Sequence, residues 1–131
     1  MRVVVDASAA IEVALNRNRS APIRQDIEDA EIVCAPDLLI PEFSNAIWKE
    51  HHFGGLNLAI CDEAFESLPE LVDIFVPSIE LYRESFQLSR ATRRPAYDMF
   101  YLALAKREDA VLLTLDTSLR KEAARQGVRI G

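Results

Sequence analysis

A short apolar run near the end of the chain constrains the fold more than any other feature. Residues 110–115 read Ala-Val-Leu-Leu-Thr-Leu, have the length of a strand and end at Asp116. Such a continuous run is typical of a parallel strand covered on both faces, whereas half-exposed strands alternate apolar and polar residues. A helix from Leu119 to Arg125 is predicted next. The run therefore predicts a central parallel strand that leads into a helix.

The same order of strand and helix recurs along the chain. Val3 to Val5 is a β-branched run closed by Asp6, and a helix from Ser8 to Leu15 follows it. Further strands are predicted at 31–35, 71–76 and 128–130. The strand at 71–76 alternates around Asp73 and stops at Pro77, so we expect it near a sheet edge. Together with helix-start signals, the pattern predicts a three-layer α/β fold whose mainly parallel sheet of about five strands is flanked by about seven helices.

Chain length and composition favour one compact domain over residues 1–131. Half of the 131 residues are hydrophobic, enough for a core without disulfides or a structural metal. Cys34 and Cys61 have no metal-ligand spacing, which favours a reduced, cytoplasmic setting. The N-terminal apolar run is too short for a signal peptide, and no apolar stretch approaches the roughly 20 residues of a membrane span. We expect a soluble protein.

The charge balance limits how the chain can bind nucleic acid. A net charge of -6 and a pI near 4.9 argue against a broad basic face. A cluster of carboxylates that binds divalent cations would, however, reverse the local potential. An acidic composition therefore remains compatible with a phosphate substrate.

Four carboxylates lie where helices are predicted to begin. Asp6 and Asp116 end strands, and Glu42 and Asp98 fall in first helical turns. Parallel winding brings such positions to one edge of the sheet. Each acid alone could be an ordinary cap or first-turn residue. Four together repel one another unless a cation lies among them, and hard oxygen ligands suit Mg²⁺ or Mn²⁺. The set predicts a site for one or two metal ions.

Asp98 is the most informative of the four acids. It lies in the first turn of an otherwise apolar helix that Pro95 opens, and helical spacing places it on the side of Tyr101, Leu102 and Ala105. A charged residue on the buried side of a helix is costly unless a partner or a ligand compensates it. Three polar residues near the acids could orient ligands or water, with ordinary capping and packing as the alternative: Ser8, Asn45 and Thr114.

At these residues the sequence resembles the PIN-domain family, in particular the VapC-type toxin ribonucleases. The resemblance runs through the segments 4–8 (Val-Val-Asp-Ala-Ser), 41–45 (Pro-Glu-Phe-Ser-Asn), 96–105 (Ala-Tyr-Asp-Met-Phe-Tyr-Leu-Ala-Leu-Ala) and 113–116 (Leu-Thr-Leu-Asp). It covers the chain from end to end, and the Tyr97-Asp98 helix is its most specific part. Met99 stands where a smaller residue is usual, and Ser118 where some members carry a further acid.

The resemblance implies an Mg²⁺- or Mn²⁺-dependent endoribonuclease, the toxin of a type II toxin-antitoxin pair. Asp6, Asp98 and Asp116 would hold the metal, Glu42 would bind it or position water, and a metal-activated water would hydrolyse the RNA phosphodiester bond. It also implies a cognate VapB-type antitoxin, whose basic tail fills the acidic groove, and a homodimer. Candidate dimer surfaces include three aromatic residues: Trp48, Phe53 and Phe65.

Several basic residues are candidates for contacts with the substrate backbone. Arg90, Arg93 and Arg94 precede the Asp98 helix, although a solvated basic helix end, favoured by the macrodipole, is the more common explanation of such a cluster. Another three would contribute if they reach the same rim: Arg17, Arg19 and Lys49. The adjacent residues His51 and His52 point in different directions on a helix, which disfavours a shared metal.

Two alternatives remain at this stage. The first is a catalytically inactive PIN-like interaction module whose acidic crevice binds a basic partner peptide. The second is a phosphoryl-transfer enzyme or receiver domain, which also uses aspartates at strand ends with magnesium. The chain has no second acid two residues after Asp6, and Pro77 follows the 71–76 strand in place of an aspartate.

Overall fold

One parallel sheet of four strands forms the centre of the protein in the computed structural model, which describes residues 1–131. The strands are β1 (Arg2–Val5), β2 (Ile32–Pro36), β3 (Ile74–Val76) and β4 (Val111–Leu113). They lie in the order β3-β2-β1-β4, and every neighbouring pair is parallel. The predicted α/β fold with a central parallel sheet is confirmed.

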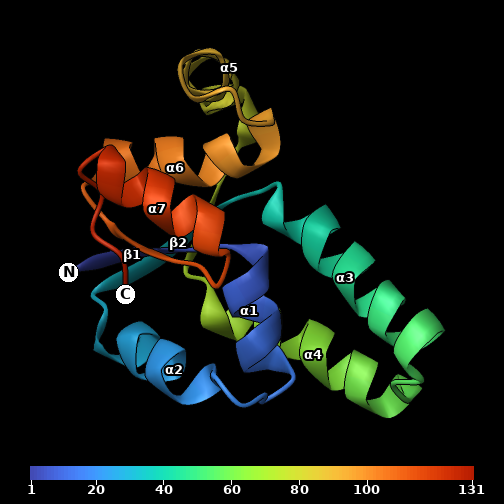
Figure 1. The fold of residues 1–131 in the computed structure, drawn as a ribbon. Helices are drawn as coiled ribbons and strands as arrows, with labels where there is room; N and C mark the ends of the chain where they lie inside the picture. The colour runs from blue at the N-terminus through green and yellow to red at the C-terminus, as the bar shows by residue number, and fades with distance from the viewer.

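Helices cover the sheet from both sides. They are α1 (Ala7–Ala14), α2 (Ser20–Asp29), α3 (Leu39–Gly54), α4 (Leu58–Leu71), the 3-10 helix η1 (Ser78–Glu80), α5 (Tyr82–Thr92), α6 (Ala96–Glu108) and α7 (Thr117–Arg125). In Figure 1 α5, α6 and α7 lie above the strands and α1, α2 and α4 below them, while α3 and α4 extend together to one side. The three layers follow from this arrangement.

The number of strands differs from the predicted five. The segment around Ile130 forms only an isolated bridge to Leu112, because just two backbone hydrogen bonds, from the Leu112 amide to Arg129 and from the Gly131 amide to Leu112, join it to β4. As a result β1 and β2 are the inner strands, and the prediction that the run at 110–115 is central was wrong.

The strand predicted at 71–76 begins later than expected. Leu71 is the last residue of α4, because the buried positions Cys61, Ala64 and Leu68 keep helical spacing up to that point. Only Ile74 to Val76 pair with β2. They do so at the sheet edge, as the alternation predicted.

The hydrophobic core lies between the sheet and the helices around it. Helix α6 packs against β1, β2 and β4 on one side and against α5 on the other. Its residues from Tyr101 to Ala105 are all buried, so the prediction of a helix packed between other elements is confirmed. Cys34 and Cys61 are buried and unpaired. None of the helices combines the length and apolarity that crossing a bilayer would require.

Candidate functional site

The carboxyl ends of β1 and β4 place Asp6 and Asp116 at the same edge of the sheet. Val5 is paired with Leu113, and the Asp6 amide donates to the Leu113 carbonyl at 3.1 Å. Each acid also caps the helix that follows it. Asp6 Oδ1 accepts from the Ala9 amide, and Asp116 Oδ1 accepts from the Leu119 amide, both at 3.0 Å. Capping and a shared site are therefore compatible here.

Two hydroxyl groups join these strand ends. The Ser8 hydroxyl donates to Asp6 Oδ1 at 2.6 Å and accepts from the Leu115 amide at 2.9 Å. The Thr114 hydroxyl donates to Asp6 Oδ2 and accepts from the Asp116 amide at 3.1 Å. Both oxygens of Asp6 are thus held in fixed positions by groups from β1–α1 and from the end of β4.

Burial changes the ionisation of Asp6. The residue is only 6% exposed, and this burial raises the pKa of its carboxyl from 3.8 to about 6. Hydrogen bonds from Ser8, Thr114 and the Ala9 amide lower that pKa, and the negative charge of Asp98 raises it. The ionised form is therefore costly at this position unless positive charge comes close.

Asp98 and Glu42 approach from α6 and α3. Burial raises the pKa of Asp98, as does the charge of Asp116, while Arg94 lowers it. Burial also raises the pKa of Glu42, with the Tyr101 hydroxyl bond lowering it and Asp98 raising it further. The charge of Asp98 thus interacts with all three other acids. The structure brings the four predicted carboxylates together.

The donor set suits a hard cation, but the side chains are not arranged around one. In the chain, no three His, Cys, Asp or Glu side chains are spaced to hold a metal ion. Asp6, Asp116 and Glu42 are each turned toward a protein donor. A carboxylate oxygen that accepts a hydrogen bond keeps a second lone pair, so these bonds orient the oxygens without blocking a metal ion, but the side chains would have to converge to bind one.

Positive charge lies beside Asp116 on one side. An open hollow of about 380 Å³ includes Asp116 and Ser8 together with Arg17 and Arg19, so these two arginines reach the same rim. Arg17 also forms an ion pair with Glu50 at 2.5 Å. Neither Lys49 nor Asn45, which are both exposed, lines this hollow.

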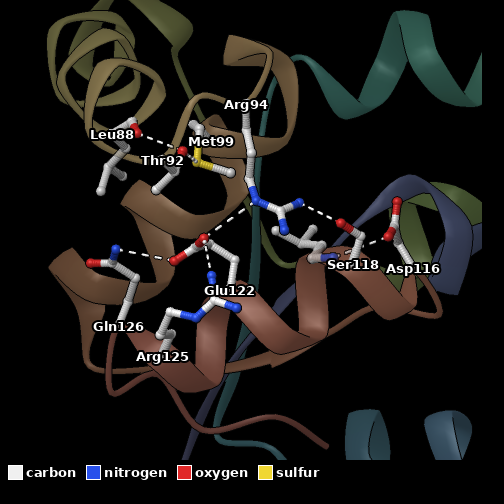
Figure 2. A network of polar contacts seen from close by, with 10 residues as sticks. Leu88, Thr92, Arg94, Met99, Asp116, Ser118, Glu122, Arg125 and Gln126 are labelled. Carbon is white, nitrogen blue, oxygen red and sulfur yellow. Dashed lines mark hydrogen bonds and ion pairs between the residues drawn. The ribbon is translucent and has the colours of Figure 1, made fainter.

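The three arginines before α6 differ in their placement. Arg94 Nε donates to Glu122 at 3.4 Å and Arg94 Nη1 donates to Ser118 at 2.6 Å, close to Asp116 (Figure 2). Arg90 lines a separate hollow on α5, and Arg93 is an exposed residue with a left-handed backbone that ends this helix. Of the three, Arg94 is the one that the structure places at the acids.

Two residues with roles at this edge were missed from the sequence. Tyr101 donates a hydrogen bond to Glu42, and burial raises the pKa of the Tyr101 hydroxyl well above its usual range. Glu122 is a further buried acid, on the helix that Asp116 caps. A signal existed for both, since Tyr101 follows Asp98 by three residues and Glu122 follows Leu119 by three on the buried side of α7.

The aromatic and histidine residues of α3 and α4 lie on the outside. Trp48, Phe53 and Phe65 are 51%, 75% and 42% exposed, which leaves them available for a partner. The His52 ring stacks on Trp48, and His51 Nδ1 is hydrogen-bonded to the Leu56 carbonyl. The histidines thus point to different neighbours, as helical geometry predicted.

The chain is similar to known proteins in sequence and in structure. The model of the PIN domain matches residues 3–124. Ribonuclease VapC3 from Pyrobaculum aerophilum is 33% identical over 127 residues, which cover 93% of this chain and 95% of that protein.

Two solved structures share the fold. PAE2754 from Pyrobaculum aerophilum has a TM-score of 0.72 and 23% identity, with 99% of this chain and 83% of the other covered. VapBC2 from Rickettsia felis bound to a DNA fragment from their promoter has a TM-score of 0.67 and 11% identity, with 100% and 98% covered. At these identities the likeness supports the fold alone.

Proposed function

Because this chain belongs to the PIN domain family, we propose that it is a metal-dependent endoribonuclease and the toxin of a type II toxin-antitoxin pair. The relative from Pyrobaculum aerophilum, which matches nearly end to end, is a ribonuclease by name. The observation that carries the proposal is the meeting of Asp6, Glu42, Asp98 and Asp116 at one edge of the sheet, where the charge of Asp98 raises the pKa values of Asp6 and Glu42 and the charge of Asp116 raises that of Asp98.

The four carboxylates would hold Mg²⁺ or Mn²⁺, as one or two ions. When bound, the metal would polarise the phosphate and supply an activated water. Ser8 and Thr114 hold both oxygens of Asp6 in place, which preorganises one ligand. Glu42, with its raised pKa and its hydrogen bond from Tyr101, is suited to hold a proton from the attacking water. Arg94 is positioned to bind the substrate phosphate, and Arg17 and Arg19 the neighbouring backbone.

The proposed partner is a VapB-type antitoxin in the cytoplasm. A solved neighbour of this fold is a VapBC2 assembly, which supports a partner of this kind. A basic tail from the antitoxin would complement the acidic edge of the sheet. We further propose a homodimer, with the exposed aromatic residues Trp48, Phe53 and Phe65 as candidate contacts.

A second candidate is an inactive PIN-like module that binds a basic peptide. It is favoured by one observation, that no three acidic side chains are spaced to hold a metal ion. A receiver domain or another phosphoryl-transfer enzyme has no such support, since the family model matches most of the chain.

The test is cleavage of a structured RNA pool with Mn²⁺, Mg²⁺ or EDTA. We expect cleavage by the wild type with metal and a loss of at least about 100-fold in Asp6→Asn and Asp98→Asn, the size of effect typical of removing a main electrostatic group. Asp62→Asn, which changes an exposed acid on α4, is the matched control. Equal cleavage by wild type and Asp6→Asn would refute the assigned nuclease site, and no cleavage with any metal would favour the binding module.

A further inference from the structure

Glu122 is a buried acid that the proposed chemistry does not use. It is 3% exposed and lies on the buried side of α7 with Leu119 and Ala123. A buried carboxylate is costly unless donors surround it. Its Oε1 accepts from Arg94 Nε at 3.4 Å and from Arg125 Nη1 at 3.1 Å, and its Oε2 accepts from Gln126 Nε2 at 3.3 Å (Figure 2). Glu122 is thus an anchor for arginine side chains.

Arg94 is held at two of its nitrogens. Its Nε is fixed by Glu122 on α7, and its Nη1 donates to the Ser118 hydroxyl one turn earlier on the same helix. A guanidinium carries five N–H donors in a planar fork, so these two contacts leave donors free, including both on Nη2. The side chain is 22% exposed, and its charge acts on Asp98. A fixed and partly accessible cation therefore lies beside the carboxylates.

We propose that Arg94 binds a phosphate of the RNA substrate and that Glu122, together with Ser118, is the positioning residue that aims it. This group of three residues is called the Arg94 cluster. The inference rests on the proposed function, because it takes the ligand at this edge to be an RNA backbone. A planar fork held at Nε and Nη1 presents the free Nη2 donors in a fixed direction, which suits a charge-assisted hydrogen bond to a phosphate oxygen. Exposed Arg90 and Arg93 have no comparable anchor.

The positive charge also explains how an acidic edge can receive an anion. Without metal, Asp98 and Asp116 repel a phosphate, and Arg94 is the cation whose charge lowers the pKa of Asp98. Ser118 supplies a neutral acceptor, so it orients Arg94 without adding another negative charge beside Asp116. The cluster thus offers one oriented cation where the local potential is otherwise unfavourable.

The experiment measures binding of a short, unstructured, fluorescently labelled RNA by anisotropy in EDTA, where metal-dependent cleavage cannot occur. Arg94→Ala is expected to weaken binding about tenfold, the effect of about one charge-assisted hydrogen bond. Glu122→Gln is expected to weaken it about fivefold in the wild-type background but less than about twofold when Arg94 is already alanine. A purely structural role for Glu122 would give the same factor in both backgrounds.

Two further variants keep the result decisive. Ser118→Ala changes an exposed residue, so it tests the same coupling if Glu122→Gln unfolds. Arg125→Ala is the matched control, because it removes the other arginine of Glu122, 69% exposed, without removing an Arg94 contact. It should change binding less than about twofold. Any of three results would overturn the inference. Arg94→Ala and Arg125→Ala could have equal effects, the effects of Arg94→Ala could be additive with those of Glu122→Gln and Ser118→Ala, or the wild type could fail to bind the RNA.

The binding data also separate this inference from the nuclease proposal. Coupled binding effects without cleavage under any metal would support the Arg94 cluster and refute the nuclease. Metal-dependent cleavage, together with an Arg94→Ala variant that binds RNA like the wild type, would support the nuclease and refute the Arg94 cluster.

Discussion

Replacing Asp6 by asparagine should make the metal-free protein more stable at neutral pH. The carboxyl is 6% exposed, and burial raises its pKa from 3.8 to about 6. Each pKa unit corresponds to about 1.4 kcal/mol, so ionised Asp6 costs the folded state about 3 kcal/mol. Between pH 3.8 and 6 the folded protein binds more protons than the unfolded chain, and its stability therefore falls as the pH rises through this window. The whole cost is present above the window and is absent below it.

Asparagine removes this cost but makes poorer hydrogen bonds. Ser8 and Thr114 both donate to the carboxylate, whereas an amide offers only one acceptor oxygen. One hydroxyl must therefore reorient, at a cost of about 1 kcal/mol. The net gain in the free energy of unfolding is about 2 kcal/mol above pH 7, or roughly 6 to 10 °C in Tm for a chain of this size.

Thermal and urea unfolding in EDTA at pH 4 and pH 7.5 would test this result. Asp6→Asn should be the more stable protein at pH 7.5 and equal to the wild type, or slightly less stable, at pH 4. Asp62→Asn should resemble the wild type at both pH values, because Asp62 is exposed. A destabilised Asp6→Asn at pH 7.5, or the same difference at both pH values, would refute the reasoning about burial.

Three other predictions follow from the same side chains. Millimolar Mn²⁺ should raise the Tm of the wild type by binding the folded state but leave Asp98→Asn nearly unchanged, as differential scanning fluorimetry would show. Phe43→Ala should lower the free energy of unfolding by about 3 to 5 kcal/mol in urea titrations, since the fully buried ring would leave a cavity. Tyr101→Phe removes the donor to Glu42, so the pKa of Glu42 should rise further and the acid limb of the cleavage pH profile should move to higher pH. Tyr97→Phe, at a 65% exposed ring, should leave that profile unchanged.

Local signals in the sequence predicted where most helices begin and end. Ser20 begins α2, Asn57 caps α4 through a bond to the Ile60 amide, and α3 ends at Gly54 with Gly55 in a left-handed conformation. The strands were harder to predict because a strand exists only where a neighbour pairs with it. Around Ile130 the sequence favours a strand, but only two backbone bonds join it to Leu112.

The site shows the same difference between features that local sequence predicts and contacts that depend on the fold. Asp6 and Asp116 could be predicted to meet because each follows a parallel strand, and topology fixes where such ends lie. The contact between Tyr101 and Glu42 joins residues 59 positions apart, and that between Arg94 and Glu122 joins residues 28 apart. No local pattern encodes these pairs, so the sequence could predict the acids of the site but not their hydrogen-bond partners.

An acid on the buried side of a helix requires a compensating partner, and Asp98 and Glu122 differ in what compensates them. Both acids lie on such a side of their helices, but their surroundings differ. Glu122 is compensated within the protein by two arginines and a glutamine. Asp98 interacts with three other acids, and Arg94 is the cation that acts on its pKa. Arg94 also pairs with Glu122, so its single charge is shared between that acid and the carboxylates around Asp98. Positive charge from outside the chain would stabilise the ionised acids further, either as a metal ion or as a basic side chain of a partner, and the proposed nuclease and the alternative binding module differ in which of the two supplies it.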